Sequence, residues 1–306
     1  MAHYLLVRLG QAALVLLGII VLTFLLTYLV PADPARMIAG QSATVETVAR
    51  IRHELGLDQS LPVQFGRYLS HIVRGDLGRS YAQKVDVGEL LRSRLPATVE
   101  LMVAGILFEL LIGLPAGVLA ALRRNTWLDQ VVMVGAFLGV SAPQFAVGLM
   151  LLYLVAFKLQ ILPLGGYGSV AHLILPAATL GIAGGGWYAR VMRSSVVEVL
   201  TQDYVRTARA KGLPPSGVVL KHVLRNAALP VVTMVGLDFG TFMGGVVVVE
   251  SVFGWPGVGQ LAWQAIQIVD IPVIMGVVIT SALAIVTGNL LADLVYPLLD
   301  PKIRYQ

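Results

Sequence analysis

The sequence predicts an all-α membrane protein with six transmembrane helices and a helical cap on one side of the bilayer. Of its 306 residues, 57% are hydrophobic and only 13% are charged, and its mean hydropathy is +0.81. Soluble domains carry about 25% charged residues, so this composition is poorly suited to water. The apolar residues are also gathered into long runs, each close to the roughly 20 residues that a helix needs to cross a bilayer. Both observations argue against a soluble enzyme or a disordered chain.

Six apolar stretches are long enough to cross the membrane. They are residues 9–30, 97–122, 131–157, 171–189, 227–249 and 271–296. The first is too long for a signal-peptide core and lacks a small-residue cleavage site, so it is expected to remain as a span. The third contains Pro143, and its length suits one kinked helix better than two spans. An even number of spans places both termini on the same side.

The basic residues near the helix ends predict that this side is the cytoplasm. The short loops that would then lie outside hold a single basic residue, Lys158. The inner positions hold Arg8, Arg123, Arg124, Lys302, Arg304 and seven of the 22 Lys and Arg residues in residues 190–225. Residues 31–96 would lie outside with nine Lys and Arg, but loops of more than about 60 residues escape this rule. Seven acidic residues largely balance the charge of that segment.

The outer segment, residues 31–96, should be folded. Apolar residues recur on one helical face in two places, each followed by a glycine stop at Gly56 or Gly75. The faces consist of Val45, Val48, Ile51 and Leu55, and of Phe65, Tyr68, Leu69, Ile72 and Val73. A third short helix is expected near residues 87–91. These helices would form either a packed lid without a ligand or a docking surface for an external partner.

Several classes of chemistry are missing from the chain. It has no cysteine, which excludes disulfides, thiolate metal sites and a cysteine nucleophile. None of its five lysines follows a glycine, so it has no phosphate-binding Walker A loop. The five histidines are scattered, and no metal site or cofactor is expected in this chain. The glycines at 184–186 lie within a span, where close helix packing is their expected use.

Four acidic residues fall within or near the apolar spans: Glu100, Glu109, Asp238 and Asp293. A charge there costs about 2.5–3.5 kcal/mol on insertion scales, so each needs an explanation. Glu100 and Asp293 are expected near helix ends, in contact with lipid headgroups. Glu109 and Asp238 would be ion sites of a secondary transporter, partners inside the bundle, or groups facing a wet passage. Asp238, Phe239 and Phe242 are the candidates for lining a passage.

The strongest local pattern is the inner stretch Asp203-Tyr-Val-Arg-Thr-Ala-Arg-Ala-Lys-Gly212. A helix over residues 204–211 would stop at Gly212, reinforced by the prolines that follow. Val205, Ala208 and Gly212 fall on one face, where small side chains permit close approach by another surface. Arg206 and Arg209 lie on the other side, and contact with lipid headgroups is the alternative use of this helix.

These residues resemble a known family. Ala208, Gly212 and the later Leu229-Pro230 are similar to the EAA loop of ABC importer permeases, the segment that docks on the ATPase. Arg206 stands where the general pattern has a glutamate, and the gap from Gly212 to Leu229 is about five residues longer. Both departures resemble the dipeptide/oligopeptide/nickel branch of the family. Matching stretches follow in order along nearly the whole chain: residues 31–34, 55–58, 75–78, 94–98, 250–259, 271–274 and 299–305.

The resemblance implies a type I permease fold and one half of the channel of an ATP-driven importer in a bacterial or archaeal inner membrane. A second, homologous permease, two ATPases that bind ATP and Mg, and an extracytoplasmic solute-binding protein would be its partners, together with membrane lipid and a peptide cargo. This subunit would not be an enzyme, and no nucleic acid is involved. The ATPase-coupling residues would be Asp203, Tyr204, Arg206, Thr207, Ala208, Arg209, Ala210, Lys211, Gly212 and Leu213.

The outer loop after the fifth span combines aromatic and turn residues, which suits a rigid re-entrant hook at the mouth of the passage. Its candidate gate or binding-protein residues are Glu250, Phe253, Trp255, Pro256 and Gly257. The alternative is that Trp255 and Trp263 anchor the loop among lipid headgroups. The expected units are thus residues 1–30, the outer segment 31–96, the permease core 97–300 with its coupling loop 193–226, and a tail over 301–306. An ion-coupled carrier working without ATPases is the alternative function.

Overall fold

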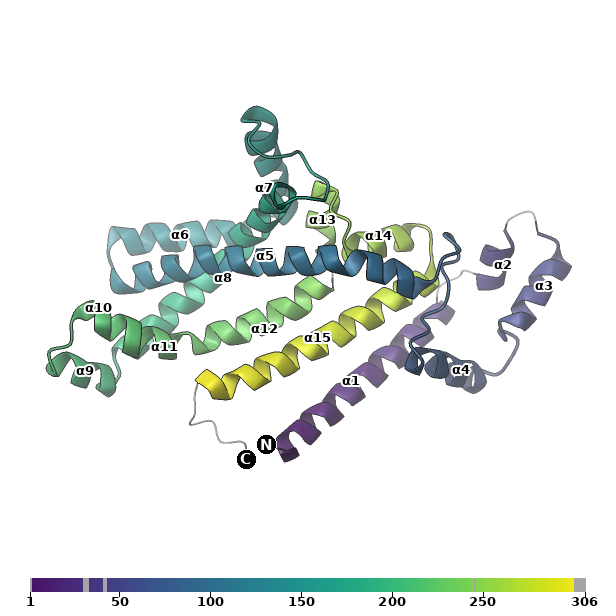
Figure 1. Ribbon diagram of the computed structural model, residues 1–306, viewed down its shortest axis with the longest axis horizontal. Helices are drawn as coiled ribbons and strands as arrows, with labels where there is room; N and C mark the ends of the chain where they lie inside the picture. The colour runs from purple at the N-terminus through teal and green to yellow at the C-terminus, as the bar shows by residue number, and fades with distance from the viewer. Residues whose placement is uncertain (1, 30–32, 41–42, 245, 300–306) are drawn as a thin grey trace.

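The chain folds into a bundle of long helices with short helices at both ends. The computed structural model describes residues 2–29, 33–40, 43–244 and 246–299 (Figure 1). The long helices are α1 (Ala2–Leu29), α5 (Val87–Leu122), α6 (Trp127–Ser141), α8 (Val170–Leu200), α12 (Leu229–Met243) and α15 (Ile271–Leu299). The described ranges contain no β-strand, only an isolated bridge between Arg79 and Asp86. The all-α fold of apolar helices is therefore confirmed.

Four of these helices, α1, α5, α8 and α15, are long and apolar enough to cross a membrane as they stand. The number among the described residues rises to six if each of two bent helix pairs is one span. Two helices extend at least ten residues beyond their predicted limits, because α8 continues eleven residues past the predicted end at 189 and α5 begins ten residues before 97. The prolines at 96 and 115 lie inside α5 without ending it.

The third predicted span is not one kinked helix. After α6, the chain breaks at residues 142–143 and continues as α7 (Gln144–Leu151) and the π-helical η1 (Leu152–Lys158), at 102° to α6. In Figure 1 this second half points away from the bundle. Ala142 is extended, with φ −73° and ψ 130°, as expected for a residue before proline. Pro143 also has no N–H to donate, so one hydrogen bond of the helical ladder is missing at this break.

The second bent pair precedes and includes the fifth predicted span. Residues 215–227 comprise α10 (Pro215–Val218), the π-helical η2 (Val219–Val223) and α11 (Leu224–Ala227), and they meet α12 at 46°. Residue 245, which the prediction placed inside the span, lies outside the described residues. Beyond it the chain forms two short helices, α13 (Val247–Phe253) and α14 (Val258–Gln267), before α15 begins.

The predicted outer segment forms a cap of three short helices, α2 (Pro34–Ala39), α3 (Val45–Glu54) and α4 (Leu61–Val73). Gly56 and Gly75 end the last two with φ of +66° and +78°, as expected for glycine stops. The third short helix expected near 87–91 is instead the first turn of α5, so the boundary drawn at residue 96 falls inside a continuous helix. Parts of the segment matched at 31–34, and the tail 301–306, lie outside the described residues.

Glycines let α5 and α8 pack closely along their length. A Cβ on Gly113 would lie 2.6 Å from the Gly185 carbonyl oxygen, and one on Gly117 would lie 2.5 Å from the Ala189 carbonyl oxygen. Real Cβ atoms do not come that near, so only glycine fits at this spacing. Gly186 likewise faces the Ala136 carbonyl of α6. The prediction that the glycines at 184–186 serve helix packing is confirmed.

The two ends of the bundle carry different elements. The cap lies at one end, whereas α9 (Asp203–Ala210) and α10 lie at the other (Figure 1). The beginning of α1 lies on the α9 side and its end approaches the cap. The predicted cap and the predicted coupling stretch are therefore separated by the length of the bundle.

Candidate functional site

The predicted coupling stretch folds as a short helix with a closed C-terminus. After α9, Gly212 has φ +75°, the left-handed conformation that glycine adopts most readily. The Gly212 N–H donates to the Arg209 carbonyl at 3.0 Å, and the Leu213 N–H donates to the Ala208 carbonyl at 3.4 Å. These two bonds form a Schellman motif, so Gly212 shapes the stretch through its backbone. Pro214 and Pro215 then start α10.

The small-residue face of α9 packs on the chain's own helices. Val205 is fully buried and Ala208 is 5% exposed. Both belong to one core cluster with Met192 and Val196 of α8 and Val218 of α10. The close approach expected at this face therefore occurs within the chain, and Ala208 does not lie on a surface that a partner can reach.

The opposite face of α9 is open. Asp203, Tyr204, Arg206, Thr207, Arg209, Ala210, Lys211, Gly212 and Leu213 are all exposed. Tyr204 and Leu213 are each 43% exposed and Leu220 is 66% exposed, so large apolar groups lie among basic ones. Arg206 reaches Asp203 at 3.6 Å, but both side chains are largely in solvent. Nine of the ten predicted coupling residues thus share one accessible surface.

The predicted gate residues lie inside the hairpin formed by α13 and α14. Glu250, Phe253 and Trp255 are at most 2% exposed. The Trp255 indole N–H donates to the Ala97 carbonyl of α5 at 2.8 Å, and the Val258 N–H donates to Thr98 Oγ1 at 2.8 Å. Trp255 is therefore not a headgroup anchor, because its ring is enclosed. Trp263, at 48% exposure, remains open on α14.

Glu250 holds the two halves of this hairpin together. Its Oε2 accepts the Gln260 N–H at 2.6 Å, and Gly257 leaves room for the carboxyl group, which a Cβ there would overlap. The other oxygen, Oε1, has no hydrogen-bond partner in the part of the chain that the structure describes. Burial raises the pKa of Glu250 to about 7, against the opposing effect of the Gln260 N–H.

The intramembrane acids Glu109 and Asp238 come together with a tyrosine. The Tyr188 hydroxyl of α8 donates to Asp238 Oδ2 of α12, and Glu109 of α5 lies beside Asp238. Glu109 is 3% exposed, and its carboxyl group fits where Gly184 has no side chain. Its Oε2 has no hydrogen-bond partner among the described residues. Three helices therefore meet at one polar cluster inside an otherwise apolar bundle.

The other acids and passage candidates are arranged differently. Glu100 is not near a helix end, since α5 begins thirteen residues earlier, and it accepts a hydrogen bond from the Tyr167 hydroxyl at 3.0 Å. The side chain of Asp293 lies outside the described residues. Phe242 is 7% exposed within the core, whereas Asp238 and Phe239 are half-buried.

Two polar contacts between distant segments were not predicted from the sequence. Arg193 of α8 donates to both carboxylate oxygens of Asp129 at 2.6 and 2.7 Å, which joins α8 to the start of α6. Asp270 accepts hydrogen bonds from Ser80 Oγ and from the N–H groups of Tyr81 and Ala82. Asp129 does show a sequence signal, because an acid in the first turn suits a helix N-terminus. The contact between Asp270 and Ser80, which lie 190 residues apart in the chain, has no sequence signal.

Comparisons with known proteins identify the family of the chain. Residues 113–305 match the family described as "Binding-protein-dependent transport system inner membrane component", and residues 1–102 match its N-terminal family. The chain is 45% identical to the glutathione transport system permease protein GsiC of Salmonella paratyphi A (strain ATCC 9150 / SARB42) and 42% identical to that of Escherichia coli (strain K12). Both alignments cover all of each chain.

A solved structure of an inward-facing MetNI methionine ABC transporter has a similar fold. The TM-score is 0.60 at 20% sequence identity, over 69% of this chain and 96% of the other. At this identity the likeness concerns the fold alone.

Proposed function

Because the chain belongs to the family described as "Binding-protein-dependent transport system inner membrane component", it is an integral inner-membrane permease subunit of an ABC importer, and we propose that it forms half of a passage for small peptides. A second permease would supply the other half. Two ATPases would bind ATP and Mg, and a solute-binding protein would deliver the cargo. The observation that carries this proposal is the separation of an exposed α9 surface from the cap by the full length of the bundle.

The α9 surface is proposed to dock on an ATPase on the cytoplasmic side. Tyr204 and Leu213 offer apolar anchors, and Arg206, Arg209 and Lys211 surround them with positive charge. Aromatic and arginine residues commonly carry the energy of a protein interface. Val205 and Ala208 transmit movement of α9 to α8 and α5, because they are packed in the same core cluster. In this scheme the two termini and α9 lie in the cytoplasm and the cap lies outside.

Replacing Tyr204 and Leu213 by alanine should uncouple ATP use from transport. The two side chains are exposed, so the chain should still fold, while an interface that loses two anchors of about 2 kcal/mol each should weaken more than tenfold. The measurement is ATP-dependent uptake in vesicles at matched membrane levels of the complex. Leu164→Ala, at an exposed position in the loop between η1 and α8, is the control and should transport normally. Normal uptake by the double variant would remove α9 as the dock.

A pair of variants at Gly212 separates backbone shape from side-chain contact. Its φ of +75° suits asparagine better than a β-branched residue, so Gly212→Asn should keep most of the uptake and Gly212→Val should lose it. No atom lies within 4 Å of a Cβ at this position, so overlap inside the chain cannot explain the difference. Equal uptake by both variants would contradict the proposed role of the Schellman turn.

The outer end is proposed to receive the solute-binding protein. The hairpin of α13 and α14 is rigidly tied to α5 through Trp255 and Thr98, so a force on the hairpin would reach a transmembrane helix directly. The polar cluster of Glu109, Tyr188 and Asp238 is the proposed polar group of the passage wall. Family membership argues against an ion-coupled carrier working alone. Uptake by the purified subunit in liposomes without ATPases would restore that alternative.

Glutathione is the first cargo to test. The relatives that are 42–45% identical over the whole chain are named as its permeases, and it is itself a small peptide. Competition of unlabelled dipeptides, longer peptides and glutathione against labelled glutathione in intact cells would rank these cargoes. No competition or uptake with any of them would reject the peptide class.

A further inference from the structure

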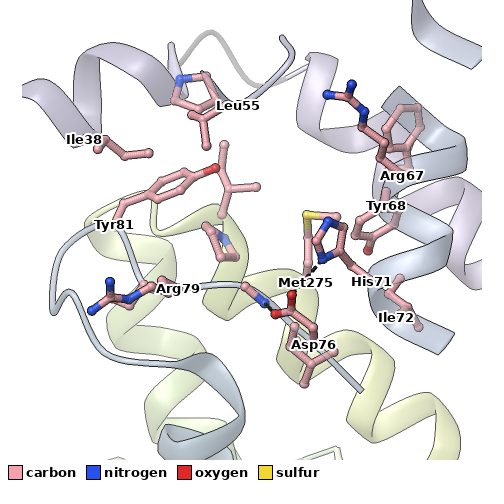
Figure 2. Close-up of a pocket in the computed structure, with 18 of the residues that line it drawn as sticks. Ile38, Leu55, Arg67, Tyr68, His71, Ile72, Asp76, Arg79, Tyr81 and Met275 are labelled. Carbon is pink, nitrogen blue, oxygen red and sulfur yellow. Dashed lines mark hydrogen bonds and ion pairs between the residues drawn. The ribbon is translucent and has the colours of Figure 1, made fainter. Parts of the chain in front are cut away.

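A cavity of about 680 Å³ lies between the cap and the adjoining ends of α1 and α15. Its walls come from α4, from the loop of residues 76–84 and from the first turns of α15, as Figure 2 shows. Cavities of roughly 300–1,000 Å³ are the usual size for small ligands. It is separate from the α9 surface, the hairpin and the polar cluster of the passage.

The floor of the cavity is apolar and lies below the ends of two membrane helices. Phe24 is five residues before the end of α1, and Ile279 is eight residues into α15. At 1.5 Å per residue, the floor reaches about 8–12 Å along these helices. Phe24 stacks on Tyr68 at 5.6 Å between ring centroids and meets Phe65 edge-on at 5.2 Å. The cavity therefore extends from headgroup depth to the depth of acyl chains.

The upper wall is charged, and three of its cations, Arg67, Arg79 and Lys84, form no ion pair within the described ranges. Asp76 is paired with His71 at 2.7 Å and also accepts the Gly78 N–H. Arg79 and Lys84 donate to the carbonyl groups of Lys84 and Ile38. The guanidinium of Arg67 lies against Gly56 and interacts electrostatically with exposed Asp58, but within the described ranges it is not within ion-pair distance of any acid. Figure 2 shows Arg67 at the upper edge of the cavity, above His71 and Met275.

The charge of the lining favours an anion. Arg67, Arg79 and Lys84 contribute three positive charges against two negative charges from Glu54 and Asp76, a balance of +1 with His71 neutral. The wall is also held in place without a ligand, since Asp270 at the start of α15 accepts three hydrogen bonds from residues 80–82. A preformed cavity lowers the conformational cost of binding.

We propose that this cavity binds an anionic glycerophospholipid from the leaflet that faces the cap. The phosphodiester lies at Arg67, and one acyl chain lies over the floor formed by Phe24, Tyr68, Met275 and Ile279. A peptide is a poor occupant because this floor has few polar atoms to receive its amide groups. The bound lipid joins α4 to α1 and α15, which otherwise meet the cap through few side chains. The proposal does not depend on which cargo is transported.

Variants on α4 and at its C-cap residue, Arg74, provide matched tests. Arg67→Gln removes the positive charge at the upper edge of the cavity, and Ile72→Trp fills the cavity. Arg74→Gln and Val73→Trp make the same changes at exposed neighbours that do not line it. The assembled complex is purified in detergent, equilibrated with phosphatidylglycerol or phosphatidylethanolamine, and analysed by native mass spectrometry. Size-exclusion profiles identify any variant that fails to fold.

Phosphatidylglycerol should remain bound to the wild-type complex and to both control variants. Its retention should fall about tenfold in Arg67→Gln, as expected for loss of a charge-assisted contact, and more in Ile72→Trp. Equal retention by all five proteins would overturn the site. Retention of phosphatidylethanolamine as strong as that of phosphatidylglycerol would show that the site does not select anionic lipids. A co-purified peptide in the cavity would show that the occupant is not a lipid.

Discussion

Glu250 places a carboxyl group where water cannot reach it. Its side chain has no exposed surface, and only one of its oxygens accepts a hydrogen bond from the described part of the chain. Desolvation penalises the charged form, so the pKa rises from its ordinary value of 4.5 to about 7. The hairpin of α13 and α14 should therefore be held most firmly when this group carries a proton.

The stability of the hairpin should depend on pH through this residue. Because the folded state binds the proton more tightly than the unfolded state, the contribution of Glu250 is fully present below pH 4.5 and is lost as the pH rises to about 7. Over this window the loss is about 3 kcal/mol. Glu250→Gln mimics the protonated form, so its thermal stability in detergent should lose this pH dependence and exceed that of the wild type at pH 8.

Exposed Glu46 on α3 provides the control for this measurement. Glu46→Gln removes an acidic group without changing any buried contact, so its pH profile should follow that of the wild type. A Glu250→Gln profile parallel to the wild-type profile would contradict a raised pKa at this position.

At the scale of single residues, the sequence identified which residues are unusual better than it identified their neighbours in the folded structure. Glu109 and Asp238 were selected because acids are costly in apolar segments, and Glu250 was selected as a gate candidate in the outer loop. The partners Tyr188 and Gly184 were not identified, because each comes from a part of the chain that only folding brings near. Ala208 shows the same limit, since a small residue suits contact with a partner and contact with the chain's own core equally well.

Helix pairs depend on the spacing that glycine permits. Gly113→Val should push α5 away from α8, because a Cβ there meets the Gly185 carbonyl and the Ala189 amide of the facing helix. Overpacking of this kind costs about 1–3 kcal/mol. The expected result is a lower midpoint temperature for loss of the monodisperse complex in detergent. Gly135→Val on α6, where nothing lies within 4 Å of the added Cβ, should leave that midpoint unchanged.

Proline shows why element boundaries were harder to predict than elements. Pro96 and Pro115 lie within the continuous α5 and Pro176 within α8, yet Pro143 ends α6. Each proline removes one backbone hydrogen bond, and the local cost is similar. The difference comes from packing: α7 leaves the bundle direction to lie against α13 and α8. Nothing within the apolar stretch 131–157 encodes those distant partners.

The whole molecule joins its cap to its membrane bundle through few polar contacts, of which the group around Asp270 is the most buried. Asp270→Ala removes three hydrogen bonds from residues 80–82 of the loop of residues 76–84, each worth about 1.5–3 kcal/mol when the acceptor is charged. Local opening of this loop should become more frequent. Limited proteolysis should therefore cut within residues 76–84 about tenfold faster or more, without an equal increase at other sites.

Asp203→Ala, an exposed change at the opposite end of the molecule, should show the wild-type cleavage rate in the loop. Unchanged cleavage in Asp270→Ala would mean that other contacts hold the cap. A general increase over all sites would mean that Asp270 supports the entire fold instead of this junction.

The sequence by itself determined that the chain is helical and membrane-embedded, and its local stop signals located α3, α4 and the end of α9. It could do so because hydropathy, helical periodicity and glycine stops act over a few neighbouring residues. Only the tertiary structure decided that α6 breaks from α7, that Ala208 and Trp255 face inward, and that α1, α4 and α15 enclose a cavity. Those features depend on contacts between segments as far apart in the chain as α1 and α15, whose energies no local pattern records.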